Sequence, residues 1–201
     1  MDAIEKLSSL FEKFPGIGPR QARRFVHFLL RSSPALRREI TQTIASLERG
    51  IKQCADCRRF FSGTDGACAI CRSSSRDKKL LIVVASDSDI ESIENANTYN
   101  GTYFVLGGIV ALDSKNPKVP NEQALLLLLS GRRGEEITEM ILALPANPEG
   151  DATEEHVRRI TSPILEKNSL RMSVLGRGLS TGSEIEYADS ETIKNALENR
   201  H

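Results

Sequence analysis

The residues that decide the fold are Leu80-Leu81-Ile82-Val83-Val84-Ala85, followed directly by Ser86-Asp87-Ser88-Asp89. The first six are aliphatic, include β-branched side chains and are apolar at every position, so neither face of a strand would be polar. A strand of this kind is buried on both faces, as strands of parallel sheets are. The polar residues that follow can begin a helix over residues 87–97. The stretch therefore predicts a buried strand of a parallel sheet.

The remainder of the C-terminal part repeats this order of strand and helix. Further strands are expected over residues 101–106, 137–144 and 170–175, and helices over residues 121–130, 151–166 and 191–198. Strands that alternate with segments of crossover length indicate an α/β layer with a mainly parallel sheet.

The N-terminal part is expected to be helical. Apolar residues three or four apart predict amphipathic helices from Ile4 to Phe14, from Ala22 to Leu30 and from Pro34 to Glu48. Ser33 can cap the third helix, with Pro34 in its first turn. The first 50 residues thus form a helical region of their own.

A short glycine-containing hairpin, Pro15-Gly16-Ile17-Gly18-Pro19, separates the first two of these helices. Its two glycines permit a tight turn whose backbone N–H groups open onto a helix N-terminus, which suits a DNA phosphate. Arg20, Arg23 and Arg24 follow and can add positive charge. The pattern resembles the helix-hairpin-helix element, which binds DNA without reading its sequence. The alternative is a plain connector between two helices.

All four cysteines lie within eighteen residues, as Cys54-x2-Cys57 and Cys68-x2-Cys71. Two such pairs can direct four thiolates at one tetrahedral centre, and zinc suits these ligands. One structural zinc per chain is therefore expected, with no open position for a substrate. The alternatives are two disulfides or a thioredoxin-like redox pair, and both fit the spacing and the expected reducing compartment less well.

The formal net charge of zero conceals two halves of opposite charge. Residues 1–79 hold 16 Lys and Arg against 8 Asp and Glu, whereas residues 80–201 hold 11 against 19. A basic half favours a polyanion such as nucleic acid, and an acidic half favours a basic protein surface or a divalent metal. The longest apolar runs, Ala124–Leu129 among them, have six residues and are too short to span a membrane. The N-terminus lacks the pattern of a secretory signal, so a cytoplasmic location is expected.

Four carboxylates are placed after two of the predicted strands. Asp87 and Asp89 follow the first strand, and Glu149 and Asp151 follow the strand over residues 137–144. Ligand sites of open parallel sheets lie at the carboxyl ends of the strands, so these side chains can meet there. Clustered carboxylates of this kind can hold Mg²⁺. Alternatively, Asp87 and Asp151 cap the helices that follow.

The order of these features resembles that of the RecR family of bacterial recombination mediators. The resemblance covers essentially the whole chain, and it implies a helix-hairpin-helix region (1–50), a four-cysteine zinc finger (51–75), a Toprim-like α/β domain (78–170) and a C-terminal segment (171–201). The motifs that carry it are Pro15–Pro19 with Arg24, the four cysteines, Tyr103-Phe104-Val105-Leu106, Ile137–Ala143, Arg177-Gly178-Leu179 and Glu186-Tyr187-Ala188-Asp189.

The resemblance also implies partners. RecR proteins act with RecO, and often RecF, at single-strand gaps, where they help RecA to replace single-strand-binding protein. They form dimers and ring-like tetramers that can encircle DNA. One departure bears on activity, because Toprim enzymes have a glutamate at the end of the first strand and this chain has Ala85.

Three functions are weighed on these grounds. The favoured one is a non-enzymatic DNA-binding mediator, because Ala85 removes a carboxylate that Toprim catalysis needs and no tyrosine has the context of a nucleophile. The second is a metal-dependent Toprim-type nuclease or primase. The third is a structural zinc-containing interaction module, which differs from the first in DNA affinity. For the mediator, Asp87, Asp89, Glu149 and Asp151 are expected to receive RecO.

Overall fold

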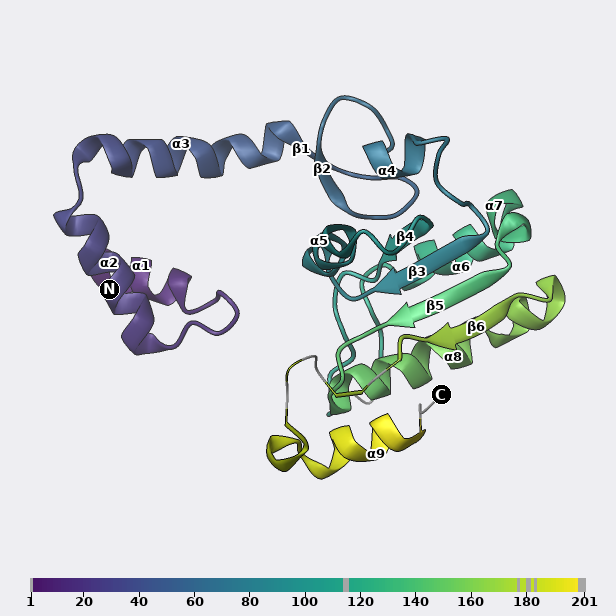
Figure 1. Cartoon of the computed structure of the whole chain (residues 1–201). Helices are drawn as coiled ribbons and strands as arrows, with labels where there is room; N and C mark the ends of the chain where they lie inside the picture. Colours follow the sequence, from purple (N-terminus) through teal and green to yellow (C-terminus); the bar gives the residue numbers. More distant parts are fainter. Residues whose placement is uncertain (1, 114–115, 177, 180–181, 183, 199–201) are drawn as a thin grey trace. The chain divides into compact units, whose positions relative to one another are not determined.

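The structure is a computed structural model that describes residues 2–113, 116–176, 178–179, 182 and 184–198 (Figure 1). Arg177 and residues 199–201, which the family motifs and the predicted C-terminal segment include, lie outside the described residues. The chain divides into two compact units, Met1–Ile51 and Lys52–His201. Among the described helices, none is both long enough and apolar enough to cross a membrane.

The first unit consists of three helices, as predicted: α1 (Ala3–Phe11), α2 (Pro19–Arg31) and α3 (Pro34–Gly50). Phe11 of α1 packs edge-on against Phe25 of α2, with ring centroids 5.7 Å apart. The Ser33 side chain accepts a hydrogen bond from the N–H of Leu36 and caps α3. Helix α1 ends before Phe14, where its prediction ended, because the chain turns there and the Phe14 carbonyl accepts from Ile17 N–H instead.

The second unit is built on a four-stranded sheet in the order β4-β3-β5-β6 (Figure 1). Its strands are β3 (Leu80–Val84), β4 (Thr102–Val105), β5 (Glu139–Ala143) and β6 (Arg171–Val174). Every neighbouring pair is parallel, and Ile82 at the centre lies beside Tyr103 and Ile141. The prediction of an α/β layer with a parallel sheet is confirmed.

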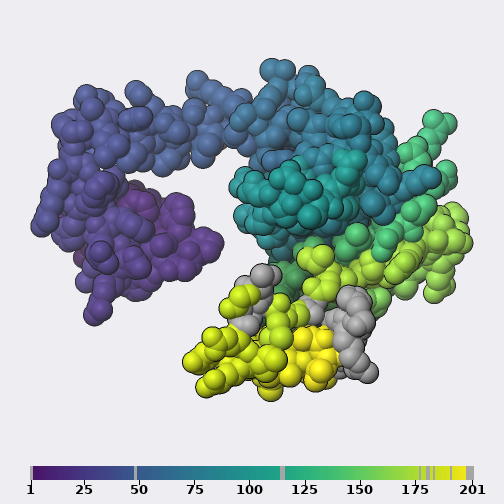
Figure 2. Space-filling view, viewed as in Figure 1, coloured from purple at the N-terminus to yellow at the C-terminus, as the bar shows by residue number. Residues whose placement is uncertain are grey.

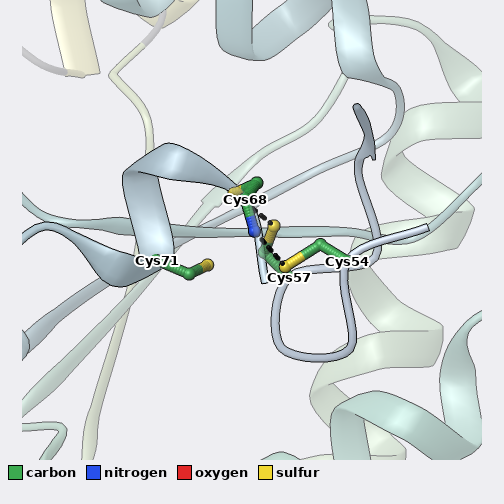
Figure 3. A group of neighbouring side chains, drawn as sticks. All are labelled: Cys54, Cys57, Cys68 and Cys71. Carbon is green, nitrogen blue, oxygen red and sulfur yellow. Dashed lines mark hydrogen bonds between the residues drawn. The ribbon is translucent and has the colours of Figure 1, made fainter. Parts of the chain in front are cut away.

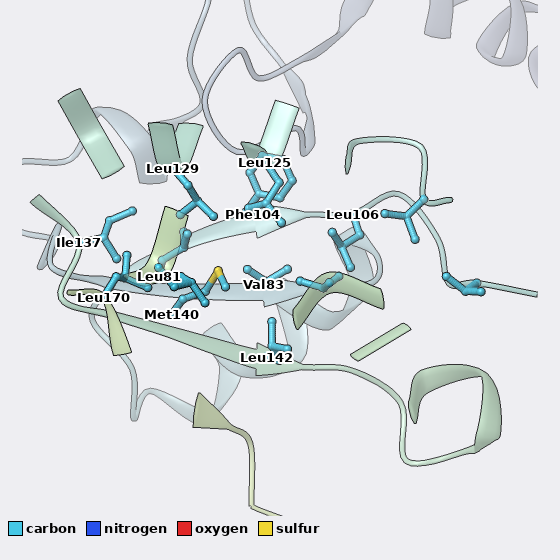
Figure 4. Close-up of a cluster of buried hydrophobic side chains, with 14 residues drawn as sticks. Leu81, Val83, Phe104, Leu106, Leu125, Leu129, Ile137, Met140, Leu142 and Leu170 are labelled. Atoms are coloured by element: carbon cyan, nitrogen blue, oxygen red, sulfur yellow. The ribbon is translucent and has the colours of Figure 1, made fainter. Parts of the chain in front are cut away.

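Helix α5 (Asp87–Ala96) covers one face of the sheet, and helices α6 (Glu122–Ser130) and α8 (Pro148–Asn168) cover the other. Helix α7 (Arg132–Glu136) follows α6, and a 3-10 turn at Ile185–Tyr187 precedes α9 (Ser190–Glu198). Leu81 and Val83 pack with Leu125 of α6 and Val157 of α8 in one core cluster (Figure 4). Their neighbours Ile82 and Val84 point to the other face and pack against Ile90 of α5. Strand β3 is apolar throughout because both of its faces are buried.

The N-caps of α5 and α8 differ from those that the alternative sequence interpretation assigned to them. Asn147 caps α8 by accepting from the N–H of Gly150 at 2.8 Å, so this helix starts at Pro148 and Asp151 lies inside its first turn. Ser86 caps α5 in a capping box with Asp89. The alternative in which Asp87 and Asp151 are the helix caps is therefore wrong, because these N-cap positions already hold an asparagine and a serine.

The segment that carries the cysteines adds three short elements, which the sequence did not predict. Strands β1 (Ile51–Gln53) and β2 (Phe60–Ser62) pair with each other, and α4 (Ala69–Arg72) follows. Elements of three or four residues have too little periodicity to be recognised from sequence. They place the two cysteine pairs within the second unit.

Candidate metal centre and nucleic-acid interface

The four cysteines converge on one point (Figure 3). Their sulfur atoms all lie within 4.8 Å of one another, and no other described group of three or more His, Cys, Asp or Glu meets this criterion. Sulfur ligands of a tetrahedral zinc ion lie about 3.8 Å apart, since each Zn–S bond is about 2.3 Å. Cys54, Cys57 and Cys68 are buried and Cys71 is half-buried. The side chains present therefore fit a metal ion with a closed set of thiolate ligands.

Local backbone hydrogen bonds shape the cluster. The N–H of Cys54 donates to Arg59 O at 2.8 Å, which closes the first cysteine turn, and Arg58 adopts a left-handed φ of 64° there. The N–H of Ala55 donates to Gly66 O at 2.9 Å and ties the two cysteine pairs together. The N–H of Cys68 also donates to the Cys54 sulfur at 3.3 Å. An N–H that points at a sulfur atom stabilises the thiolate form.

The thiols influence one another strongly. The pKa of Cys68 is lowered, first by a hydrogen bond from the Cys57 thiol and then by one from Cys71. The same contact with Cys68, at 3.6 Å between sulfur atoms, raises the pKa of Cys57. Crowded buried thiols cannot all ionise without a positive charge among them. A bound dication removes this conflict, because it accepts all four as thiolates.

The hairpin before α2 has two glycines with different constraints. Gly16 has a φ of +74°, a conformation that side chains disfavour, so the turn itself requires glycine. Gly18 is the N-cap of α2, with φ −86° and ψ 171°, and a Cβ there would meet nothing within 4 Å. The fold therefore does not require glycine at position 18. Glycine also occurs where the backbone must let a ligand approach closely, and this is the remaining reason for glycine at position 18.

The N-terminus of α2 is strongly positive. No side chain caps it, and its first turn contains no acidic residue. Arg20, Arg23 and Arg24 are exposed, and none has an ion pair within the described residues. Positive side chains at the positive end of a helix dipole are unfavourable by themselves and become favourable when an anion binds. The structure places Arg20, Arg23 and Arg24 in the first two turns of α2, and their contact with phosphates stays a prediction.

The four predicted acidic residues lie in the first turns of α5 and α8, which follow the neighbouring strands β3 and β5. Asp89 is engaged in the cap of α5, where it accepts from Ser86 N–H at 2.8 Å. Asp87 accepts from the backbone N–H of Phe60 at 2.7 Å. Within the described residues these carboxylates do not form a group with metal-binding spacing. They form an acidic edge, defined here as Asp87, Asp89, Glu149 and Asp151.

Sequence reasoning missed a half-buried network that joins the segment after the cysteines to α5 and β4. Arg76 pairs with Glu94 of α5 at 2.8 Å, and the Tyr103 hydroxyl donates to the same carboxylate at 2.5 Å. The pKa of Glu94 is lowered, above all by Arg76, and burial only partly opposes this. The pKa of Tyr103 is raised by burial and then by its bond to Glu94. No sequence signal identifies this network, because its two bonded pairs are 18 and 9 residues apart along the chain.

Comparisons with known proteins agree with this architecture. Residues 79–176 match the model of the Toprim domain, and residues 178–201 match that of the RecR C-terminal family. The proteins named recombination protein RecR from Prochlorococcus marinus (strain MIT 9301), Pediococcus pentosaceus and Chlorobium phaeobacteroides (strain BS1) are 35%, 36% and 32% identical to this chain. The aligned regions cover 98%, 99% and 98% of this chain and 94%, 96% and 96% of those relatives.

The family match over the parallel sheet defines a Toprim-domain protein, and the cysteine cluster that precedes this domain could hold a metal ion. The relatives identify a narrower family within this class, since the alignment covers nearly the whole of both chains and is not limited to the Toprim domain. The chain belongs to the RecR family.

Proposed function

We propose that this chain is a non-enzymatic, DNA-binding mediator of recombinational repair that works at single-strand gaps. In this role it assists RecA loading together with RecO and RecF. Its relatives are named recombination proteins, and they match this chain over nearly its whole length. Both facts support a role in recombinational repair. The observation that carries the molecular role is the uncapped, arginine-rich N-terminus of α2.

DNA binding is assigned to Gly16, Gly18, Arg20, Arg23 and Arg24. The free N–H groups at the start of α2 receive a phosphate oxygen, and the arginines add charge along the backbone. None of these groups reads a base, so binding is independent of sequence and falls steeply with salt.

The metal is assigned as one structural zinc ion, held by Cys54, Cys57, Cys68 and Cys71. Four thiolate ligands leave no open coordination position, so bound zinc supplies folding energy to the cysteine segment rather than chemistry on a substrate. The four cysteines are free thiols, which suits a cytoplasmic protein whose thiols stay reduced.

The competing function is a metal-dependent Toprim-type enzyme. Against it, Ala85 lies at the end of β3, where the resemblance leads one to expect a glutamate, and it is 7% exposed. The carboxylate of Asp89 is also committed to its helix cap. A site that lacks one carboxylate and shares another binds Mg²⁺ weakly.

The acidic edge is assigned to a basic protein partner, for which RecO is the family candidate. Its carboxylates lie in the first turns of two helices that follow adjacent strands, so their negative potentials add. Such a surface steers a basic partner and repels DNA, which confines DNA to the basic N-terminal part of the chain.

Self-association is assigned in part to the first unit. An apolar cavity of about 340 Å³ in this unit is lined by Leu7, Phe11, Val26 and neighbouring aliphatic residues. Phe28, Leu30 and Ile44 nearby are 60%, 56% and 61% exposed. Apolar surface of this kind favours a second copy of the chain, and a ring of copies would add weak DNA contacts through multivalency.

The test compares two double variants that remove equal charge from the first unit. Arg20→Ala with Arg24→Ala removes the α2 contacts, whereas Arg38→Ala with Arg49→Ala removes two exposed arginines of α3. Anisotropy of a labelled single-stranded oligonucleotide, measured over a range of salt concentrations, should show the larger loss and the flatter salt slope for the first variant. Equal losses would refute the hairpin as the DNA site, and unchanged affinity in both would refute DNA binding by this unit.

A further inference from the structure

Asp87 has a role in the structure that its place on the acidic edge does not explain. Its carboxylate accepts a hydrogen bond from the N–H of Phe60 at 2.7 Å, across 27 residues of sequence. Phe60 begins β2 and follows the metal-ligating turn that contains Cys57. An aspartate in the first turn of α5 therefore fixes the backbone just after one of the four cysteines.

A second contact fixes the same turn from the neighbouring strand. The N–H of Val105, the last residue of β4, donates to the carbonyl of Cys57 at 2.8 Å. The first cysteine pair is thus held by the ends of two adjacent elements of the α/β layer.

The second cysteine pair rests on the same layer. Ile70, which lies between Cys68 and Cys71, packs against both the cysteine cluster and the core cluster beneath α5. In Figure 2 the blue surface of the cysteine segment meets the teal surface of α5 directly. Both halves of the metal site therefore depend on the α5 side of the sheet for their position.

We propose that Asp87 is a positioning residue for the metal centre, and that release of the metal requires its bond to Phe60 to open. The inference rests on the proposed zinc site. Because coupling between two sites is reciprocal, a partner that binds the acidic edge and draws Asp87 away from Phe60 would loosen the metal. Metal loss would in turn free Asp87 for a partner. Metal binding by the cysteines would therefore change the affinity of the acidic edge for that partner.

The physical basis is the acceptor that Asp87 supplies. Its carboxylate makes a charge-assisted bond to Phe60 N–H, and within the part of the chain that the structure describes no other side chain accepts from that group. Removal of the acceptor leaves a backbone donor without its partner and lets the Cys57 turn move. Asparagine keeps a side-chain oxygen at the same place, so it should preserve most of the effect.

The experiment measures zinc release from the full-length protein to a coloured chelator. Asp87→Ala should accelerate release about tenfold, and Asp87→Asn should change it much less. Glu91→Ala is the matched control, because Glu91 is an exposed acidic residue of the same helix, and it should release zinc at the wild-type rate. In the cobalt-substituted protein, Asp87→Ala should also alter the ligand-field absorption bands, since the geometry around Cys57 relaxes.

The outcomes separate the inference from the function on which it rests. Wild-type release kinetics and cobalt spectra in Asp87→Ala would overturn the inference, as would equal acceleration by Glu91→Ala. Wild-type protein that carries no metal would instead overturn the proposed zinc site. If Asp87→Ala is insoluble, hydrogen exchange of the Phe60 amide in the wild type and in Asp87→Asn decides. Slow exchange is expected in both proteins, because a side-chain oxygen at position 87 accepts from this N–H. Rapid exchange already in the wild type overturns the inference.

Discussion

Substitution of Gly18 by serine should strengthen the fold and weaken DNA binding at the same time. Gly18 occupies the N-cap of α2 with φ −86° and ψ 171°, an extended conformation that serine adopts readily. A Cβ at this position meets nothing within 4 Å. The serine hydroxyl would accept a hydrogen bond from the N–H of Arg20 or Gln21, and these are the groups assigned to a phosphate.

The size of each effect follows from the geometry. Serine is a better N-cap than glycine by a few tenths of a kcal/mol, which corresponds to a rise in Tm of about 1–2 °C for a small unit. The hydroxyl would compete with the phosphate for its donor, so affinity should fall about five- to tenfold. Simple damage to the hairpin cannot produce both changes, because it would lower stability as well.

The assay pairs thermal unfolding with oligonucleotide anisotropy at about 50 and about 200 mM salt. Gly16→Ala is the contrasting variant, since its φ of +74° makes any side chain strained, and it should lose about 1–2 kcal/mol of stability. A Gly18→Ser protein that is more stable and binds DNA as tightly as the wild type would refute the assignment of the α2 amides to DNA.

Three further predictions concern the second unit. Cys54→Ser should reduce zinc content and loosen the cysteine segment, as measured by elemental analysis and limited proteolysis, because a lost ligand opens the closed site. Glu94→Gln should make the stability of the protein less sensitive to acid. The pKa of Glu94 is lowered in the folded protein, so its carboxylate stabilises the fold above the ordinary carboxyl pKa, and this stability is lost as pH falls through the native pKa. In acid denaturation the wild type should therefore lose more stability than the variant. Glu149→Lys should abolish capture of RecO at moderate salt while zinc content and circular dichroism stay unchanged, and undiminished capture would remove the acidic edge as the partner site.

The parallel sheet could be predicted because its signals are local. Leu80–Val84 is apolar at consecutive positions, and burial of both faces is the reason. The four cysteines could be grouped because two CxxC pairs within eighteen residues favour one shared site over two disulfides or a redox pair. The start of α8 could also have been predicted, since Asn147 followed by Pro148 is a standard N-terminal signal, whereas the predicted helix began only at Asp151.

Contacts between groups that are far apart along the chain could not be predicted from the sequence. In the bond from Phe60 N–H to Asp87, the donor is a backbone group that nearly every residue has, and the carboxylate could equally have been assigned to a metal or a helix cap. Neither group therefore carries a sequence signal for this pairing. The pairing of Arg76 with Glu94 likewise depends on how α5 lies on the sheet. Such contacts are properties of tertiary packing, and neither periodicity nor motif spacing encodes them.

The attachment of the cysteine segment to α5 and β4 determines when, during synthesis of the chain, this segment can reach its final structure. The N-terminal part of a chain leaves the ribosome first, so Cys54 to Cys71 emerge before Asp87 and Val105, which later hold them. Until residue 105 has emerged, the four thiols lack the platform on which they rest in the finished protein. The nascent chain therefore passes through a stage in which these thiols are open to oxidation and to any thiol-binding metal ion.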